Sequence, residues 1–271
     1  MNWIENESLI RMLAFAGVFL AMALLEFALP RKERVQSRVP RWVTNFGLVI
    51  IDSIVLRLLF PVLAVGVAIW ASSKNYGLFS YLDWPFWLEV TLTVIILDFA
   101  IYWQHVAAHK VPVFWLVHRV HHADRDLDAS SGLRFHPIEI VLSLLFKFLV
   151  IILLGAPALG VFLFEILLNG CAMFNHANLK IPSSVDRVLR LAIVTPDMHR
   201  VHHSILRREA DTNYGFNLSF WDRLFGSYTE QPEGGHDGMT IGLSDQQTDK
   251  PSRLDWCLTF PFQRKKPADE K

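Results

Sequence analysis

Long apolar runs constrain this chain more than any other feature of its sequence. Four such runs cover residues 9–29, 43–71, 85–104 and 138–174. A helix of about 20 apolar residues spans a bilayer, so the first and third runs each predict one crossing. We expect Pro61 to bend the second. The fourth is too long for one crossing, and Gly155-Ala156-Pro157 predicts a turn between two helices that either cross the bilayer or dip into it.

The composition supports a membrane protein and excludes several other classes. Of the 271 residues, 52% are hydrophobic and mean hydropathy is +0.30, which excludes a disordered chain. Basic and acidic residues number 26 each, so no charge excess points to nucleic acid. Two cysteines, Cys171 and Cys257, are too few for a disulfide scaffold or a thiolate metal cluster. The first eight residues carry two acids and no base, which is not the charge of a cleaved signal peptide.

The basic residues predict how the chain lies in the membrane. Loop 30–42 holds five of them and segment 105–137 holds four, whereas loop 72–84 holds only Lys74. Because basic loops stay in the cytoplasm, this alternation predicts five crossings from an outside N-terminus. All the histidines then fall on the cytoplasmic side. We expect the protein to lie in a membrane such as the bacterial inner membrane. We therefore expect an all-α integral membrane protein with four to five membrane helices and a cytoplasmic histidine-rich helical cap.

This reading divides the chain into four parts. They are the N-terminal membrane spans (1–104), the first cytoplasmic histidine segment (105–137), a membrane helical hairpin (138–174) and a C-terminal cytoplasmic cap with the last histidines (175–271).

Eight of the eleven histidines fall in three short motifs with helical spacing. The motifs are H-x-x-x-H at His105 and His109, and H-R-V-H-H at His118, His121 and His122 and again at His199, His202 and His203. Residues three and four apart share one face of a helix, so each motif points its imidazoles in one direction. Three such helices could bring eight imidazoles to one cavity. That number exceeds the need of one tetrahedral zinc and suits two metals with open positions.

Other residues near these motifs are further candidates. His176 and His136 each lie where a membrane run meets a polar segment, so both are candidate ligands, although either could be an interface anchor. His236 stands in a glycine-rich stretch and is read as a loop residue. Asp98 shares a helical face with His105 and could orient a ligand through its imidazole N–H, and Asp197 could do the same for the last motif. A solvated helix end is the alternative for Asp98.

At these residues the chain resembles the fatty acid hydroxylase and sterol desaturase superfamily of membrane di-iron enzymes, over about residues 85–245. The segments that carry the resemblance are D-F-A-I-Y-W-Q-H-V-A-A-H (98–109), F-W-L-V-H-R-V-H-H (114–122), L-R-F-H-P (133–137), N-H-A-N-L-K-I-P (175–182), T-P-D-M-H-R-V-H-H-S (195–204), N-Y-G-F-N-L-S-F-W-D-R-L-F-G-S-Y (213–228) and I-G-L (241–243). The chain looks closest to bacterial sterol-desaturase-like proteins and their alkylglycerol monooxygenase relatives.

The resemblance implies an oxidoreductase with a specific metal site. It implies two non-haem irons, dioxygen as co-substrate, and hydroxylation or desaturation of a lipid C–H bond. The implied ligands are His105, His109, His118, His121, His122, His199, His202 and His203, with His176 at a further family position. The chain departs from the eukaryotic fatty acid hydroxylases at Ala172, where those enzymes resemble H-x-x-x-H. Whether His136 fills that vacancy is an open question.

Partners and alternatives also follow from the resemblance. Electrons would come from a separate ferredoxin- or b-type-cytochrome-like reductase system, because the sequence shows no G-x-G-x-x-G motif. The substrate would be a membrane lipid of the fatty acyl, alkylglycerol or sterol-like type. A carotenoid or isoprenoid hydroxylase of the same metal type and a non-catalytic metal-binding protein remain alternatives. Zinc can replace iron during preparation, and imidazole ligands alone do not distinguish the two metals.

Overall fold

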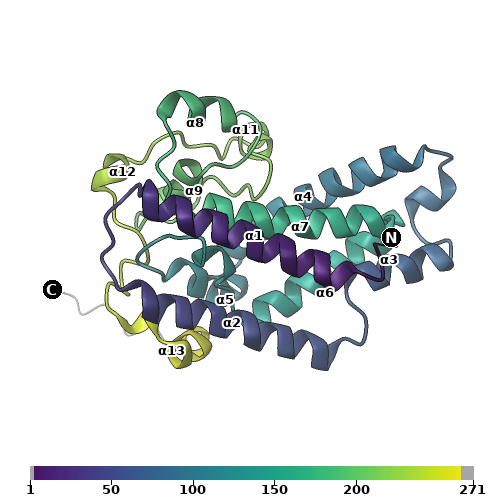
Figure 1. Cartoon of the computed structure of the whole chain (residues 1–271), viewed down its shortest axis with the longest axis horizontal. Helices are drawn as coiled ribbons and strands as arrows, with labels where there is room; N and C mark the ends of the chain where they lie inside the picture. The colour runs from purple at the N-terminus through teal and green to yellow at the C-terminus, as the bar shows by residue number, and fades with distance from the viewer. Residues whose placement is uncertain (1–2, 264–271) are drawn as a thin grey trace.

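The computed structural model describes residues 3–263, and over this range every regular element is a helix. Figure 1 shows the long helices side by side, with most of the shorter ones gathered at one end of the bundle and α3 (Ala64–Ser73) at the other. The long helices are α1 (Glu7–Ala28), α2 (Arg38–Leu59), α4 (Phe86–Lys110), α6 (Pro137–Leu154) and α7 (Ala158–Asn175). Each is part of one of five segments that are long and apolar enough to cross a bilayer. This confirms the predicted all-α membrane fold.

The shorter helices fill the connections and the cap. They are α3 (Ala64–Ser73), η1 (Leu78–Tyr81), α5 (Pro112–His122), η2 (Ser131–Leu133), α8 (Ser183–Leu189), α9 (Pro196–His202), α10 (Arg207–Ala210), α11 (Phe220–Leu224), α12 (Gly235–Gly238), η3 (Lys250–Ser252), α13 (Leu254–Thr259) and η4 (Phe260–Phe262). The five long helices alternate in direction, so the segments that follow α4 and α7 emerge at the same end of the bundle as the loop between α1 and α2.

Proline and glycine set the helix ends where the sequence predicts them. The second apolar run is interrupted at Pro61, between the end of α2 and the start of α3. Gly155 ends α6 with a left-handed φ of 67°, which a residue with a Cβ adopts only at a cost, and Pro157 then precedes α7. By contrast, α4 continues past residue 104 to Lys110. The boundary predicted between 104 and 105 therefore falls inside one continuous helix.

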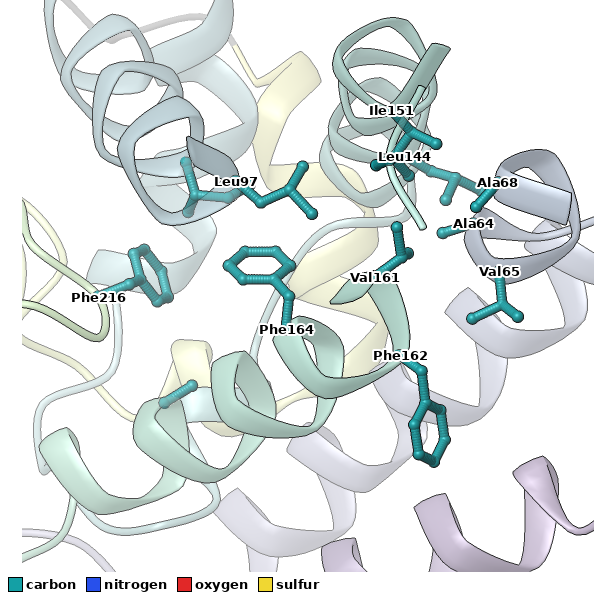
Figure 2. Packing of buried hydrophobic residues seen from close by; sticks show 13 residues of the cluster. Ala64, Val65, Ala68, Leu97, Leu144, Ile151, Val161, Phe162, Phe164 and Phe216 are labelled. Carbon is teal, nitrogen blue, oxygen red and sulfur yellow. The ribbon is translucent and has the colours of Figure 1, made fainter. Parts of the chain in front are cut away.

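The apolar core joins the bundle to the cap. Figure 2 shows Leu97 of α4 and Phe164 of α7 in one cluster with side chains of α3 and α6. Phe216, from the cap, completes this cluster and lies beside Phe164 in the view. Leu97 and Phe164 are completely buried, so they stabilise the bundle through close van der Waals packing between the membrane helices. This packing fixes the end of α4, which carries the first two histidines, against α7 and the cap.

Charged side chains cross-link three membrane helices. Glu165 of α7 accepts hydrogen bonds from Arg11 of α1 at 2.8 Å and from Lys147 of α6 at 2.7 Å. Charges inside a bilayer are costly unless they are paired. The three side chains satisfy one another and so hold α1 and α6 against α7.

Candidate metal centre

Nine buried histidines form two adjacent groups where the bundle meets the cap. In each group every residue offers a ligand atom within 4.8 Å of the others. The five-histidine group consists of His105, His109, His118, His122 and His202. The four-histidine group consists of His121, His176, His199 and His203. The structure thus brings together all eight motif histidines and His176.

Each H-R-V-H-H motif supplies both groups. In the first motif His118 and His122 enter the five-histidine group, and His121 enters the other. The second motif reverses this division, since it sends only His202 to the five-histidine group. Residues four apart point together, while the residue between them is rotated along the helix by about 60° or more from either. The two groups therefore share α5 and α9, and their rings touch across the boundary, with His122 and His203 centroids 4.5 Å apart.

The imidazoles face one another through their Nε2 atoms. In the five-histidine group the Nε2 atoms of His109 and His122 are 3.1 Å apart. In the four-histidine group His176 Nε2 lies 3.1 Å from both His121 Nε2 and His199 Nε2. With metal–nitrogen bonds of about 2.1 Å, two imidazole nitrogens at right angles would lie about 3 Å apart. The spacing therefore fits nitrogen atoms arranged around two metal ions.

Backbone carbonyls accept from the opposite nitrogen of several rings. Nδ1 of His105 lies 2.7 Å from the carbonyl oxygen of Tyr214, and Nδ1 of His202 lies 2.7 Å from that of Thr212. Nδ1 of His176 is likewise 2.7 Å from the carbonyl of Ala172, the position where the sequence departs from the eukaryotic hydroxylases. A proton held on Nδ1 leaves the Nε2 lone pair free, which is the tautomer that a metal requires.

Two carboxylates orient two further rings, those of His118 and His109, and sequence reasoning missed both acids. Glu139 Oε1 accepts from His118 Nδ1 at 2.6 Å, and Asp211 Oδ1 lies 3.3 Å from His109 Nδ1. Such carboxylate–imidazole pairs fix the ring and increase its basicity. Glu139 carries a recognisable signal, since it is an acid in the first turn of the apolar helix α6. Asp211 lies in a polar loop and has no comparable signal.

The acids predicted for this role have other partners. Asp98 accepts from the indole Nε1 of Trp221 at 2.8 Å and from the backbone N–H of Leu218 at 3.2 Å, so it anchors α11 to α4. Asp197 pairs with Arg31 and Arg200. Both acids are close to the histidines in sequence, but their carboxylates hold the cap in place.

The remaining two histidines lie outside both groups. His136 forms the N-cap of α6, where its Nδ1 accepts from the backbone N–H of Ile138 at 3.2 Å and its Nε2 lies 3.2 Å from the Leu258 carbonyl. His136 therefore does not replace the histidine that the resemblance to the eukaryotic hydroxylases implies at the position of Ala172. His236 is buried near Asp197, with 3.7 Å between Nε2 and Oδ2. Burial lowers the pKa of His236 to about 4, so this ring is neutral at pH 7.

Burial also keeps several of the clustered imidazoles neutral. It lowers the pKa of His176 to about 4 and that of His202 to about 3. For His121, His199 and His203, burial and the neighbouring imidazoles hold the pKa well below its usual range. Neutral imidazole is the form that binds a metal, so the site is prepared for ligation at neutral pH.

A buried ion network holds the segment that follows α5. The guanidinium of Arg41 donates to Asp124 at 2.7 and 2.8 Å and to Asp128 at 2.5 Å. The pKa of Asp124 falls to about 2 because Arg41 outweighs the effect of burial. Farther along this segment, a Cβ built on Gly132 would lie 2.4 Å from the Ala172 carbonyl and 3.2 Å from His176 Nδ1. Only glycine allows this close approach to the four-histidine group.

Apolar rings cover the groups on the membrane side. Phe135 stacks on His121 with centroids 4.6 Å apart, and Phe216 lies 5.1 Å from His105. Both phenylalanines belong to or pack against the core cluster of the bundle. Trp115 contacts His109 at 5.0 Å. The histidines therefore lie directly against an apolar, water-poor region.

Comparison with known proteins agrees with this geometry. The chain is 34% identical to ornithine lipid hydroxylase OlsE of Rhizobium tropici, over 55% of this chain and 44% of that protein. It is 33% identical to human alkylglycerol monooxygenase, over 62% of this chain and 36% of that protein. It is 29% identical to Delta(7)-sterol 5(6)-desaturase erg3B of Aspergillus fumigatus, over 58% of this chain and 42% of that protein.

The match to these curated relatives spans less than half of their length. No solved structure matches the chain significantly. The model of the fatty acid hydroxylase family matches residues 90–227, which is half of the chain and includes all nine clustered histidines. The resemblance noted from the sequence is confirmed, and the chain belongs to the fatty acid hydroxylase family.

Proposed function

We propose that this protein is a membrane di-iron oxygenase that hydroxylates or desaturates a C–H bond of a lipid. The observation that carries the proposal is the pair of histidine groups with converging Nε2 atoms. The proposed ligands are the nine histidines of these groups. Nine nitrogens exceed the four that a structural zinc takes, and they suit two irons with room for a further molecule.

The chemistry needs an oxidant that amino acids cannot supply. Hydroxylation consumes one dioxygen, two electrons and two protons, and it yields the alcohol and water. Two bound irons would supply the oxidising power for this reaction. The chain's own residues would bind the metals, orient the ligand imidazoles and exclude water. Glu139 and Asp211 hold the imidazoles of His118 and His109, while Phe135 and Phe216 keep water from the apolar side of the site.

The surroundings of the site support an apolar substrate. Phe216 contacts His105 and also belongs to the core cluster between the membrane helices. A lipid chain could therefore reach the histidines without crossing water. We propose a fatty acyl, alkylglycerol or sterol-like lipid, in keeping with relatives whose names specify an ornithine lipid, alkylglycerol and a sterol.

Electrons and orientation complete the proposal. A ferredoxin- or b-type-cytochrome-like reductase system would deliver electrons to the end of the bundle that carries the cap. The basic loop 30–42 emerges at this same end, which favours a cytoplasmic location for the histidines. In a bacterium this would be the cytoplasmic face of the inner membrane.

The test begins with metal content, measured on protein purified anaerobically from iron-replete cells. We expect two irons per chain, and ¹⁸O from labelled dioxygen in a hydroxylated lipid product when reductant and reductase are added. A desaturated product would carry no label, so the experiment distinguishes the two reactions. Product formed under rigorous exclusion of oxygen would contradict the proposal. Stoichiometric metal without oxygen consumption on any lipid would instead favour a non-catalytic metal-binding protein.

A further inference from the structure

The cap carries a patch of large apolar side chains that are 42–67% exposed in the described part of the chain. The patch, called here the α8–α11 lip, consists of Val185, Val188, Leu191, Phe220, Leu224 and Phe225. The exposed fraction is 66% for Val188, 67% for Leu191 and 55% for Leu224. A patch of large apolar side chains on a cap that faced only water would be unfavourable, and such patches mark contact surfaces.

Both helices of the lip bury charged side chains and expose apolar ones, which is the reverse of a surface helix on a water-soluble protein. Asp186 of α8 and Arg190 at its C-cap pair with each other and are buried, whereas Val185 and Val188 face outward. Arg190 also donates to the carbonyl of Glu230 at 3.0 Å. A surface helix in water buries its apolar face. Exposed apolar side chains with buried charged ones are expected on a helix that is surrounded by lipid.

The same inversion occurs in α11. Asp222 is fully buried and accepts from the backbone N–H groups of Tyr214 and Gly215 at 2.7 and 2.9 Å. Phe220 and Leu224 lie four residues apart and are exposed together. The buried charged side chains Asp186, Arg190 and Asp222 thus each have a partner inside the protein, and the apolar side chains of the lip are left for an external partner.

The two helices form one surface. Ser219, just before α11, donates its hydroxyl to the carbonyl of Arg190 at 2.7 Å and its backbone N–H to that of Ala192 at 3.2 Å. An isolated bridge pairs Ile193 with Leu218. The end of α8 and the start of α11 are therefore held side by side.

The lip continues the outer surface of a membrane helix. Along α4 an outward stripe runs through Leu88, Thr91, Ile95 and Trp103, at spacings of three, four and eight residues. Phe225 packs on the last of these, with its ring centroid 5.0 Å from that of Trp103. Tryptophan is common where a span meets the membrane interface. The stripe that faces lipid on α4 therefore leads directly onto α11.

The position along the bundle agrees with this continuity. Figure 1 shows α8 and α11 flanking the bundle near the cap end of α1, whereas α12 lies beyond that end. Of the charged residues within α8, only Arg187 is exposed. A basic side chain beside apolar ones can reach the phosphates of headgroups while its neighbours enter the acyl region.

We propose that the α8–α11 lip is inserted into the lipid bilayer, so that the cap is partly embedded at the membrane interface. The partner is the acyl region of the same leaflet into which the cap end of α4 reaches. This proposal concerns only where the lip lies, so it stands or fails separately from the metal chemistry.

Spin labels measure this position in the intact protein. The full chain with Cys171→Ala and the buried Cys257 retained is labelled at Val188→Cys or at Leu224→Cys and reconstituted in vesicles of phosphatidylcholine and phosphatidylglycerol. Glu233→Cys, beside α12, is the matched control because its side chain is 63% exposed and lies on the cap. An unchanged far-ultraviolet circular dichroism spectrum and a monodisperse elution profile verify that each variant is folded.

Power saturation then compares collisions with oxygen, which concentrates in lipid, and with a water-soluble nickel chelate. We expect oxygen to dominate at positions 188 and 224 and the chelate to dominate at position 233. Chelate access at 188 and 224 equal to that at 233 would place the lip in water and overturn the proposal. Low access to both reagents would indicate contact with a second copy of the protein, and it would overturn the proposal as well.

Discussion

His121 and His122 are adjacent in the chain, yet their imidazoles belong to different groups. Their ring planes are perpendicular, at 89°, with centroids 5.4 Å apart. His121 faces His176, while His122 faces His109. A single helix, α5, therefore supplies both groups from successive positions.

This division makes the two residues separable probes of metal binding. We expect His121→Ala to weaken the metal of the four-histidine group and His122→Ala to weaken that of the five-histidine group. Metal analysis of purified protein would show a reduced content in each single variant and a larger loss in the double variant. His236→Ala is the control and should retain the full content, since His236 lies outside both groups. Equal loss in His236→Ala would contradict the assignment.

The carboxylate contacts predict a contrast between two acids. Glu139→Ala removes the acceptor 2.6 Å from His118 Nδ1, so metal affinity should fall by about 10–100-fold. Glu139→Gln retains an acceptor oxygen, so its metal affinity should fall by less than that of Glu139→Ala. Asp98→Asn is the matched control, because Asp98 bonds Trp221 and Leu218. Competition with a chelator measures all three affinities. A loss in Asp98→Asn as large as in Glu139→Ala would show that orientation by Glu139 is not the cause.

The close approach of Gly132 predicts a strong effect from one methyl group. Gly132→Ala would place a Cβ 2.4 Å from the Ala172 carbonyl, which must then move away from His176. We expect reduced metal content and a lower apparent melting temperature. Gly170→Ala in the neighbouring helix α7 should be tolerated, because its Cβ would meet only Val18 Cγ2 at 3.9 Å. Wild-type metal binding by Gly132→Ala would show that the segment can shift without cost to the site.

The buried ring of His236 predicts a pH dependence of stability. Its pKa is lowered to about 4 in the folded protein, against about 6.5 in the unfolded chain. Between these values the unfolded chain binds a proton that the folded protein does not, so stability falls as the pH decreases below about 6.5. His236→Asn should remove this contribution. As the pH decreases from about 7.5 to 5, the melting temperature of this variant minus that of wild type should therefore increase, with both proteins measured in the same detergent. A difference independent of pH would contradict the neutral buried ring.

The sequence predicts the fold well because membrane helices obey a local rule. The length of each apolar run and the turn at Gly155 are enough to place α1, α6 and α7. His136 shows the limit of local reading. It precedes Pro137, and proline is common at the first position of a helix, yet its closeness to the histidine motifs left a ligand role open.

The partners of the site could not be predicted in the same way. Helical spacing indicates which imidazoles share a face, but the division of each motif between two groups depends on how α5 and α9 face one another. Asp211 is 102 residues from His109, and Glu139 is 21 residues from His118. Such contacts depend on how whole helices pack against one another, and the spacing of residues in one sequence does not predict that packing.

The sharing of both motifs between the two groups has a consequence for biosynthesis. On the proposed ligand set, the five-histidine group needs His202, which follows all five candidate membrane spans in the chain. The four-histidine group needs His199 and His203 from the same helix end. A ribosome that has made only the membrane helices has therefore made neither metal site. Loading with metal would have to wait until the cap is synthesised and folded, and a chain truncated before residue 199 would insert in the membrane with both sites incomplete.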